Sequence, residues 1–248
     1  MEIVLSRILK YLNGCLTKDY LYMISLFIVQ NYIDMENYDL DRLVKEGGFT
    51  KEEILDFCFK LGFKDYKSFH QTLINDYELR VNQIRERMFG IQIETFLNKL
   101  DQDYDKEELK QALETICDLV FKNKRVILIG ALYPMSISVE LQTDFITFGK
   151  EVIQYHHFMN DIELTDKDIV IFMSATGRTL NQFMTNNTIN KQNGKIILIT
   201  QNKKFINHHL DADHVIWVPG KFDGIEFNYQ MMVLLDVLRI YYLKKYYL

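Results

Sequence analysis

In the first half of the chain, apolar residues recur three or four positions apart, which is the spacing of one face of a helix. Segment 20–33 follows this pattern through Leu21, Ile24 and Ile28. Thr50 precedes another such segment and Glu53 follows three residues later, the signature of a capping box at a helix start. Helices are therefore expected over residues 20–33, 40–48, 51–61, 65–88 and 106–124.

After residue 125 the pattern changes to short apolar runs that alternate with helical segments. Each run is rich in β-branched or aromatic residues and is bounded by turn residues, as buried strands are. Alternation of strands and helices predicts an α/β fold, a doubly wound parallel sheet flanked by helices, behind the all-α first half. Strands are expected at 125–130, 151–156, 168–174, 194–200 and 214–219, and helices at 135–148, 179–192 and 226–246.

Composition places the chain among soluble globular proteins, because 48% of its 248 residues are hydrophobic and 25% are charged. The formal net charge of -5 gives no general attraction to nucleic acid. No apolar run approaches the roughly 20 residues of a membrane span, and the start of the chain has no signal-peptide pattern. Cys15, Cys58 and Cys117 are odd in number and lack metal-like spacing, so reduced thiols of a cytoplasmic protein are expected.

The run "LVKEGGFTKEEILDFCFKLGFKDYKSFHQTL" resembles the N-terminal helix-turn-helix domain of RpiR-type bacterial transcriptional regulators. The resemblance implies that operator DNA is a partner of this domain. The positions that match the family pattern are Thr50, Phe57, Lys60, Leu61, Gly62, Phe63, Tyr66 and Phe69. The candidate DNA-binding residues are Thr50, Lys51, Lys60, Lys64 and Lys67.

The charges around this motif depart from the family pattern. Asp56 stands where the family usually has arginine, and Glu52 and Glu53 occupy the first turn of the recognition helix, which reads bases. Carboxylates there face phosphates and accept hydrogen bonds only from cytosine amines. Residues 1–77 carry nine Lys and Arg against twelve Asp and Glu. Two alternatives stay open for this domain: it binds DNA, or it is a dimerisation element without DNA binding. The cationic run that follows either touches phosphate or is solvated, and it consists of Arg80, Arg85 and Arg87.

The second half resembles a sugar isomerase (SIS) domain, which senses phosphosugars in RpiR-type regulators. Its "SATGRT" segment, residues 174–179, corresponds to the S-x-S-G-x-T pattern of that family. Hydroxyls and backbone N–H groups at a helix N-terminus favour an anion, while Gly177 allows a sharp turn. The alternative is that the hydroxyls are ordinary cap and turn residues. The candidate ligand-binding residues are Gly130, Ser136, Ser174, Thr176, Gly177, Arg178, Thr179 and Glu226.

The loop after the first strand departs from the SIS pattern. Leu132 replaces the family's second glycine, and Pro134 replaces its serine and has no N–H to donate. Ser136 and Ser138, on the following helix, are candidates to compensate for the missing serine. Tyr133 either lines a pocket or blocks it.

Catalysis is not expected from this site. Asn181 stands where isomerising members carry glutamate, and an amide cannot act as a general base. Glu226 is an alternative base. Its position at the start of a helix is also explained by the helix dipole, which favours a negative side chain there. The other candidate bases, each also explained as a surface or capping residue, are His156, His157, His208 and His209. Adjacent histidines point apart, so no metal site is expected, and no cofactor is expected either.

Together these patterns predict a cytoplasmic regulator of carbohydrate metabolism, with no membrane association, that binds DNA and senses a phosphosugar. The expected domains are a helix-turn-helix domain at 1–77, a connecting helix or linker at 78–105, and a SIS domain at 106–248. The apolar last helix favours a homodimer or tetramer. The alternatives are an isomerase-like enzyme and a degenerate SIS dimer with weak or no DNA binding.

Overall fold

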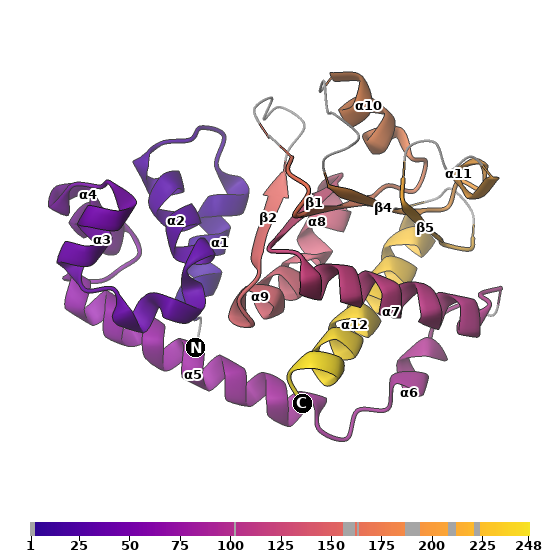
Figure 1. The fold of residues 1–248 in the computed structure, drawn as a ribbon, viewed down its shortest axis with the longest axis horizontal. Coiled ribbons are helices and arrows are strands. Elements are labelled where there is room, and N and C mark those ends of the chain that lie inside the picture. Colours follow the sequence, from indigo (N-terminus) through magenta and orange to yellow (C-terminus); the bar gives the residue numbers. More distant parts are fainter. Residues whose placement is uncertain are drawn as a thin grey trace. The chain divides into compact units, whose positions relative to one another are not determined.

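The chain forms two compact units in a computed structural model (Figure 1). Unit 1 comprises Met1–Glu86 and Thr143–Glu151, and unit 2 comprises Arg87–Gln142 and Val152–Leu248. The expected domain borders at residues 77 and 105 stay predictions. No helix within the described residues is both long and apolar enough to span a bilayer. The structure describes residues 3–101, 103–155, 162, 164–186, 194–207, 212–220 and 224–248.

Unit 1 is built mainly from helices whose ends are fixed by local side chains. Thr50 and Glu53 form the expected capping box, and Asp39 accepts a hydrogen bond from the Arg42 N–H at the start of the preceding helix. That helix ends at Gly48, which has a left-handed φ of 73°. The elements are α1 (Val4–Gly14), α2 (Tyr20–Gln30), the 3-10 helix η1 (Tyr32–Asn37), α3 (Leu40–Gly47), α4 (Lys51–Lys60) and α5 (Tyr66–Met88).

Two features of unit 1 differ from the expected pattern. The helix expected over 20–33 ends at Gln30, because Asn31 leaves the helical conformation and its side-chain amide donates to the Phe27 carbonyl. The 3-10 turn η1 follows directly. Helix α1 was not expected, yet it buries Leu5 and Ile8 completely in the core.

Unit 2 contains the expected parallel sheet, so the α/β fold class is confirmed. The strand order is β2-β1-β3-β4-β5, and the three pairs from β1 to β5 are parallel. Figure 1 shows α10 on one side of the sheet and α7 and α12 on the other. The elements are α6 (Ile93–Leu97), α7 (Lys106–Lys122), β1 (Arg125–Gly130), α8 (Leu132–Ile137), α9 (Val139–Thr147), β2 (Glu151–Tyr155), β3 (Asp168–Met173), α10 (Arg178–Asn186), β4 (Lys195–Thr200), α11 (Lys204–Asn207), β5 (His214–Trp217) and α12 (Ile225–Tyr246).

The order of the strands places a topological switch between β1 and β3. The chain leaves β1 toward β2 on one side and later returns to β3 on the other side of β1. In open α/β sheets, ligands bind in the crevice at the carboxyl ends of such strands. At the opposite, amino edge, Arg125 donates two hydrogen bonds to Asp168 at 2.8 and 2.5 Å. The ends relevant to binding are therefore Gly130 and Met173, which are paired in register.

The helix expected over 135–148 is two helices, α8 and α9, with Ser138 between them. The Ser138 hydroxyl donates to the Met135 carbonyl at 2.8 Å, which competes with continued helical bonding. Helix α9 begins in unit 2 and ends in unit 1, since the division falls between Gln142 and Thr143. The expected helix over 179–192 is α10 as far as Asn186, and 187–192 lie outside the described residues.

Candidate functional site

The turn after β3 lies at the carboxyl edge of the sheet, beside the switch point. Ser174 follows Met173 directly, and its N–H donates to the Ile199 carbonyl of β4 at 3.0 Å. The Gly177 N–H donates back to the Ser174 carbonyl at 3.1 Å, which closes the turn before α10. The structure thus brings the candidate residues 174–179 together with Gly130 at one edge of the sheet.

The carbonyl groups of this turn are fixed against the end of β4. The Ala175 carbonyl accepts from the Gln201 N–H and from the Thr200 hydroxyl, both at 3.0 Å. The Thr176 carbonyl accepts from the Asn202 side-chain amide, also at 3.0 Å. Because a trans peptide points its N–H away from its C=O, the Thr176 N–H is directed away from β4. Within the described part of the chain, the N–H groups of Ala175 and Thr176 donate no hydrogen bond.

The hydroxyls of the turn also act as caps for α10. The Thr179 N–H lies 3.4 Å from the Ser174 hydroxyl, and the Arg178 N–H lies 3.4 Å from the Thr176 hydroxyl. These distances are long for hydrogen bonds, so an incoming anion competes for these donors at little cost. Thr176 and Arg178 are exposed, while Ser174 is buried. The turn therefore offers N–H donors, hydroxyls, a guanidinium and a helix N-terminus to an anion.

Gly177 is required by two separate features of the turn. Its φ is 78°, in the left-handed region. A Cβ on this residue would also lie 2.2 Å from the ring of Phe205. The ring of Phe205 therefore packs directly on the backbone of the turn.

The loop after β1 is closed by packing at the position of the missing serine. A Cβ on Gly130 would lie 3.0 Å from the Pro134 Cβ and 3.1 Å from the Met173 carbonyl oxygen. Pro134 is buried, while Tyr133 is 69% exposed. Tyr133 therefore does not plug this edge, and the glycine is needed for close approach of β1, β3 and Pro134.

Ser136 and Glu226 belong to α8 and α12, not to the turn at 174–179. Ser136 is exposed on α8 and lines a cavity of about 340 Å³ against α12, together with Leu235 and Arg239. Ser138, the other candidate to compensate, is buried. The side chain of Glu226 packs on Gly220 after β5, at the same edge of the sheet as the turn.

The structure supplies no carboxylate on α10 for proton transfer. Asn181 is exposed, and its backbone N–H donates to the Gly177 carbonyl at 3.3 Å. The four candidate histidines, residues 156, 157, 208 and 209, lie outside the described residues. The described ranges contain no group of three His, Cys, Asp or Glu residues that could hold a metal ion.

Four residues that hold the turn were not identified from the sequence: Thr200, Gln201, Asn202 and Phe205. A signal for the first three was present, because a polar Thr-Gln-Asn run begins at the last residue of the strand predicted at 194–200. In a parallel sheet, all carboxyl ends meet at one edge. Phe205 carries no comparable signal.

On α4, two candidate DNA-binding lysines are engaged in ion pairs. Lys51 lies 2.7 Å from Asp41, which raises the pKa of the lysine. Lys60 pairs with Asp56, which also accepts from the Tyr20 hydroxyl, and these two bonds lower the pKa of the Asp56 carboxyl. Their charges are therefore partly neutralised within the unit.

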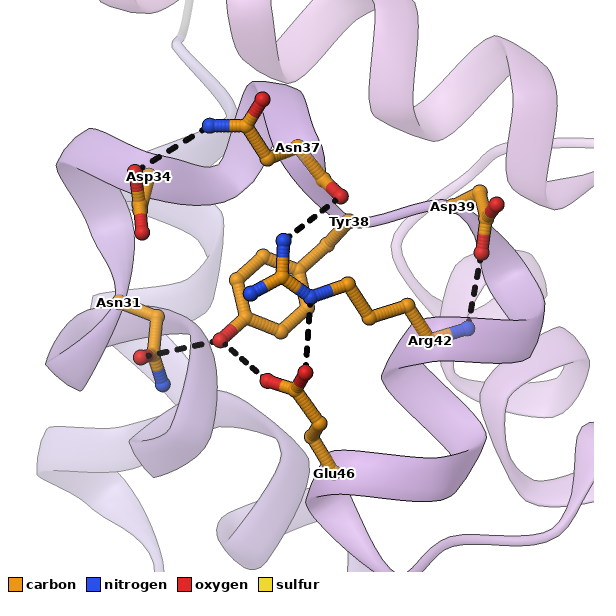
Figure 2. A network of polar contacts seen from close by, with 7 residues as sticks. All are labelled: Asn31, Asp34, Asn37, Tyr38, Asp39, Arg42 and Glu46. Carbon is orange, nitrogen blue, oxygen red and sulfur yellow. Dashed lines mark hydrogen bonds and ion pairs between the residues drawn. The ribbon is translucent and has the colours of Figure 1, made fainter.

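Arg42, one of the two cations of α3, is likewise engaged, as Figure 2 shows. The Arg42 guanidinium donates to Glu46 at 2.9 Å and to the Asn37 carbonyl at 3.2 Å. It also lies 4.3 Å from the centre of the Tyr38 ring, and the Tyr38 hydroxyl donates to Glu46 at 2.9 Å. This network stabilises the turn before α3 and reduces the positive charge available to DNA.

The remaining candidate cations divide into two groups. Lys64 and Lys67 are exposed and form no ion pair with any residue that the structure describes. Arg80, by contrast, is buried and lies 2.8 Å from Asp144 of α9, so it is not a phosphate contact. Arg85 and Arg87 are exposed near the end of α5.

Comparisons with known proteins give structural likenesses only. No protein-family model and no curated protein matches the chain. Vibrio vulnificus NanR, complexed with ManNAc-6P, is similar over 98% of this chain and 92% of its own, with 15% identity and a TM-score of 0.45.

Two further structures are also similar. A hypothetical protein from Methanococcus jannaschii, with an inferred function of 3-hexulose-6-phosphate isomerase, matches 62% of this chain and 88% of its own, with 20% identity and a TM-score of 0.47. A second hypothetical protein matches 69% and 91%, with 18% identity and a TM-score of 0.49. These identities and scores are low, so the three likenesses assign no function to this chain.

Proposed function

We propose that this chain is a regulatory protein that binds a sugar phosphate at the turn between β3 and α10. The observation that carries the proposal is the fixed orientation of this turn. The Ala175 and Thr176 carbonyls are held against β4, and the Ala175 and Thr176 N–H groups make no hydrogen bond to described residues. A phosphate group fits such donors beside a helix N-terminus. The resemblance of residues 174–179 to SIS domains supports a sugar phosphate as the ligand class.

The same geometry favours sensing over turnover. Isomerisation moves a proton between adjacent carbons and needs a positioned base. Asn181 offers an amide at the position that is acidic in isomerising members. Ligand binding would then act by linkage, favouring whichever arrangement of the protein binds the ligand more tightly.

The ligand half of the proposal predicts a thermal shift. A panel of hexose phosphates, pentose phosphates and inorganic phosphate should include a ligand that stabilises the chain by about 2.7 kcal/mol at 100 times its Kd. Thr176→Ala combined with Thr179→Ala should weaken that ligand at least a hundredfold, because each of the two lost hydrogen bonds to a charged group contributes about 1.5–3 kcal/mol. Differential scanning fluorimetry measures both effects.

Thr185→Ala is the matched control, since this hydroxyl lies on the same helix but donates to the Asn181 carbonyl. It should leave the affinity unchanged. A panel without any stabilising member would contradict the proposal and favour a degenerate dimer. Conversion of the ligand, followed by phosphorus NMR, would instead favour the isomerase-like alternative.

The output half of the proposal is that unit 1 contacts the backbone of DNA through Lys64 and Lys67. These lysines follow α4 in the motif that resembles a helix-turn-helix, and they are exposed. Lys51 and Lys60 are engaged with Asp41 and Asp56, so they contribute less. Contacts to phosphate position a protein on DNA but carry little sequence information.

Binding to a 20-base-pair duplex should therefore be strongly salt-dependent. Lys64→Ala and Lys67→Ala should each reduce the slope of log K against log salt by about 1. Lys51→Ala is the control and should change the slope less, because its charge is paired with Asp41. Fluorescence anisotropy at several salt concentrations measures the slopes. Absence of binding at low salt, or equal slopes in all three variants, would remove DNA from the proposal.

The proposal includes a homodimer or tetramer. Ile225, Tyr229 and Met232 are exposed at spacings of four and three residues along α12, so they form one apolar stripe. Such a stripe is typical of a surface that pairs with another protein. Analytical ultracentrifugation of the purified chain measures the stoichiometry.

A further inference from the structure

One row of residues along α12 is open to solvent, although most of the helix is buried. Twelve of its 22 residues are buried, and a helix that is apolar on all sides is normally enclosed by protein. The open row repeats at intervals of four and three residues, which is the spacing by which paired helices face each other in a coiled coil. We call this row the α12 seam, and it consists of Ile225, Tyr229, Met232, Asp236 and Arg239.

The first half of the α12 seam projects, and its second half is hollow. Ile225 is 81% exposed and Tyr229 is 50% exposed. The second half borders the cavity of about 340 Å³ between α12 and the helices α8 and α9, whose apolar wall includes the buried Leu141 and Leu235. Met232 lies at the junction, since it is 43% exposed and also lines the cavity. One face of the helix therefore carries both a projection and a hollow.

The polar end of the cavity contains one cation and two carboxylates. Arg239 donates to Asp236 at 2.6 Å and lies 3.6 Å from Glu140. The side chain of Arg239 is 14% exposed, whereas those of Asp236 and Glu140 are 38% and 64% exposed. A carboxylate accepts several hydrogen bonds, so these two groups suit a neutral hydroxyl donor better than a second anion.

These charges decide the direction in which a second α12 can lie on the α12 seam. In a parallel pair each residue faces its own counterpart, so Asp236 opposes Asp236 and Arg239 opposes Arg239, which is unfavourable. In an antiparallel pair that overlaps the whole seam, the two-fold axis passes through the middle position, Met232. Tyr229 then faces Asp236 of the second copy, and Ile225 faces the aliphatic stem of its Arg239. The antiparallel pair therefore opposes no like charges within the seam.

We propose that α12 pairs antiparallel with α12 of a second copy, and that Tyr229 of each copy enters the cavity of the other. The Tyr229 hydroxyl donates there to the Asp236 carboxylate, while Met232 packs on its own counterpart. The face is self-complementary, so the contact forms twice and closes a dimer. Tyrosine is a common anchor of interfaces, because it buries a large ring and carries a donor. The inference rests on the homodimer of the proposed function and identifies the residues that form it.

Disulfide cross-linking of the purified full-length chain tests the pairing, with the partly exposed Cys15 replaced by serine. Met232→Cys lies on the two-fold axis and should give a covalent dimer, because helix axes about 8–10 Å apart bring facing Cα atoms within disulfide range. Ile225→Cys is the control. It is more exposed, but its counterpart lies opposite residue 239, roughly 21 Å further along the axis, so it should give at least tenfold less dimer.

Tyr229→Ala should weaken the dimer about a hundredfold in sedimentation equilibrium, because the anchor is lost from both copies. Phe89→Ala removes a ring that is 89% exposed outside the seam, and it should leave the affinity unchanged. Equal weakening by both variants would show non-specific association and overturn the proposal.

The cross-linking results separate this pairing from other assemblies. Efficient cross-linking through both Met232→Cys and Ile225→Cys would indicate a parallel pair and overturn the proposal. A chain that sediments as a dimer but gives no disulfide through Met232→Cys pairs through another surface, which overturns this contact and leaves the homodimer. A monomeric chain removes both. Neither result alters the sugar-phosphate proposal, which the ligand-dependent thermal shift tests separately.

Discussion

Asp144→Ala should lower the free energy of unfolding by about 3–5 kcal/mol, because it leaves the Arg80 guanidinium buried without this carboxylate. The Asp144 side chain is fully buried and that of Arg80 is 9% exposed, so water cannot replace the lost partner. A change of this size should lower the midpoint of thermal unfolding by roughly 10 °C in a chain of this length. Urea unfolding followed by circular dichroism measures the loss.

Two companion variants separate the charge effect from general damage. Asp41→Ala breaks the exposed pair with Lys51 and should change the free energy of unfolding far less than Asp144→Ala does. Arg80→Met combined with Asp144→Leu removes both charges and should recover most of the stability lost in Asp144→Ala. If the double variant were as unstable as Asp144→Ala, the loss would reflect packing rather than an uncompensated charge.

Gly177→Ala should destabilise unit 2 by about 3 kcal/mol and abolish ligand stabilisation. About 1–2 kcal/mol arises from the positive φ, which disfavours any residue with a Cβ. The remainder arises from the overlap with Phe205, since overpacking typically costs about 1–3 kcal/mol. The turn must shift to relieve the overlap, and its N–H groups then lose their orientation. Urea unfolding and the ligand-dependent thermal shift measure the two effects.

Glycines elsewhere in the chain provide controls for each part of this effect. Gly48 has a φ of 73° and open space around its Cβ position, so Gly48→Ala isolates the cost of the backbone angle. Gly14→Ala, with an ordinary φ and open space, should be neutral or slightly stabilising. Gly177→Ala costing no more than Gly48→Ala would show that Phe205 moves aside freely. In that case the turn is not rigid.

Local signals made the larger elements predictable from the sequence. The Thr50–Glu53 capping box appears as expected, because both partners lie within one turn of helix. The parallel sheet follows from alternating buried strands and helices, and the structure confirms it. The candidate turn at 174–179 was also placed correctly at a strand end, since hydroxyls and a glycine directly follow the apolar run.

Contacts between residues far apart in the sequence explain the features that local sequence patterns do not predict. The carbonyl of Ala175 is held by Thr200 and Gln201, a separation that no local pattern records. The pairing of Asp56 with Tyr20 is equally remote, and it changes how the charges of α4 are available. The break at Ser138 is local by contrast, since the Ser138 hydroxyl donates to the Met135 carbonyl three residues earlier and competes with the helix. The roles of the site residues themselves stay proposals.

Unit 1 consists of two separate segments of the chain, so it cannot be completed until the second segment has been synthesised. Helices α1 to α5 emerge from the ribosome before α9 does, but their unit also includes Thr143–Glu151. Arg80 must wait for Asp144, which lies 64 positions later in the chain. At about 5–20 residues per second, this interval lasts roughly 3–13 s. During that time the nascent helices expose the surface that α9 later covers, so a holding chaperone has a defined window in which to bind.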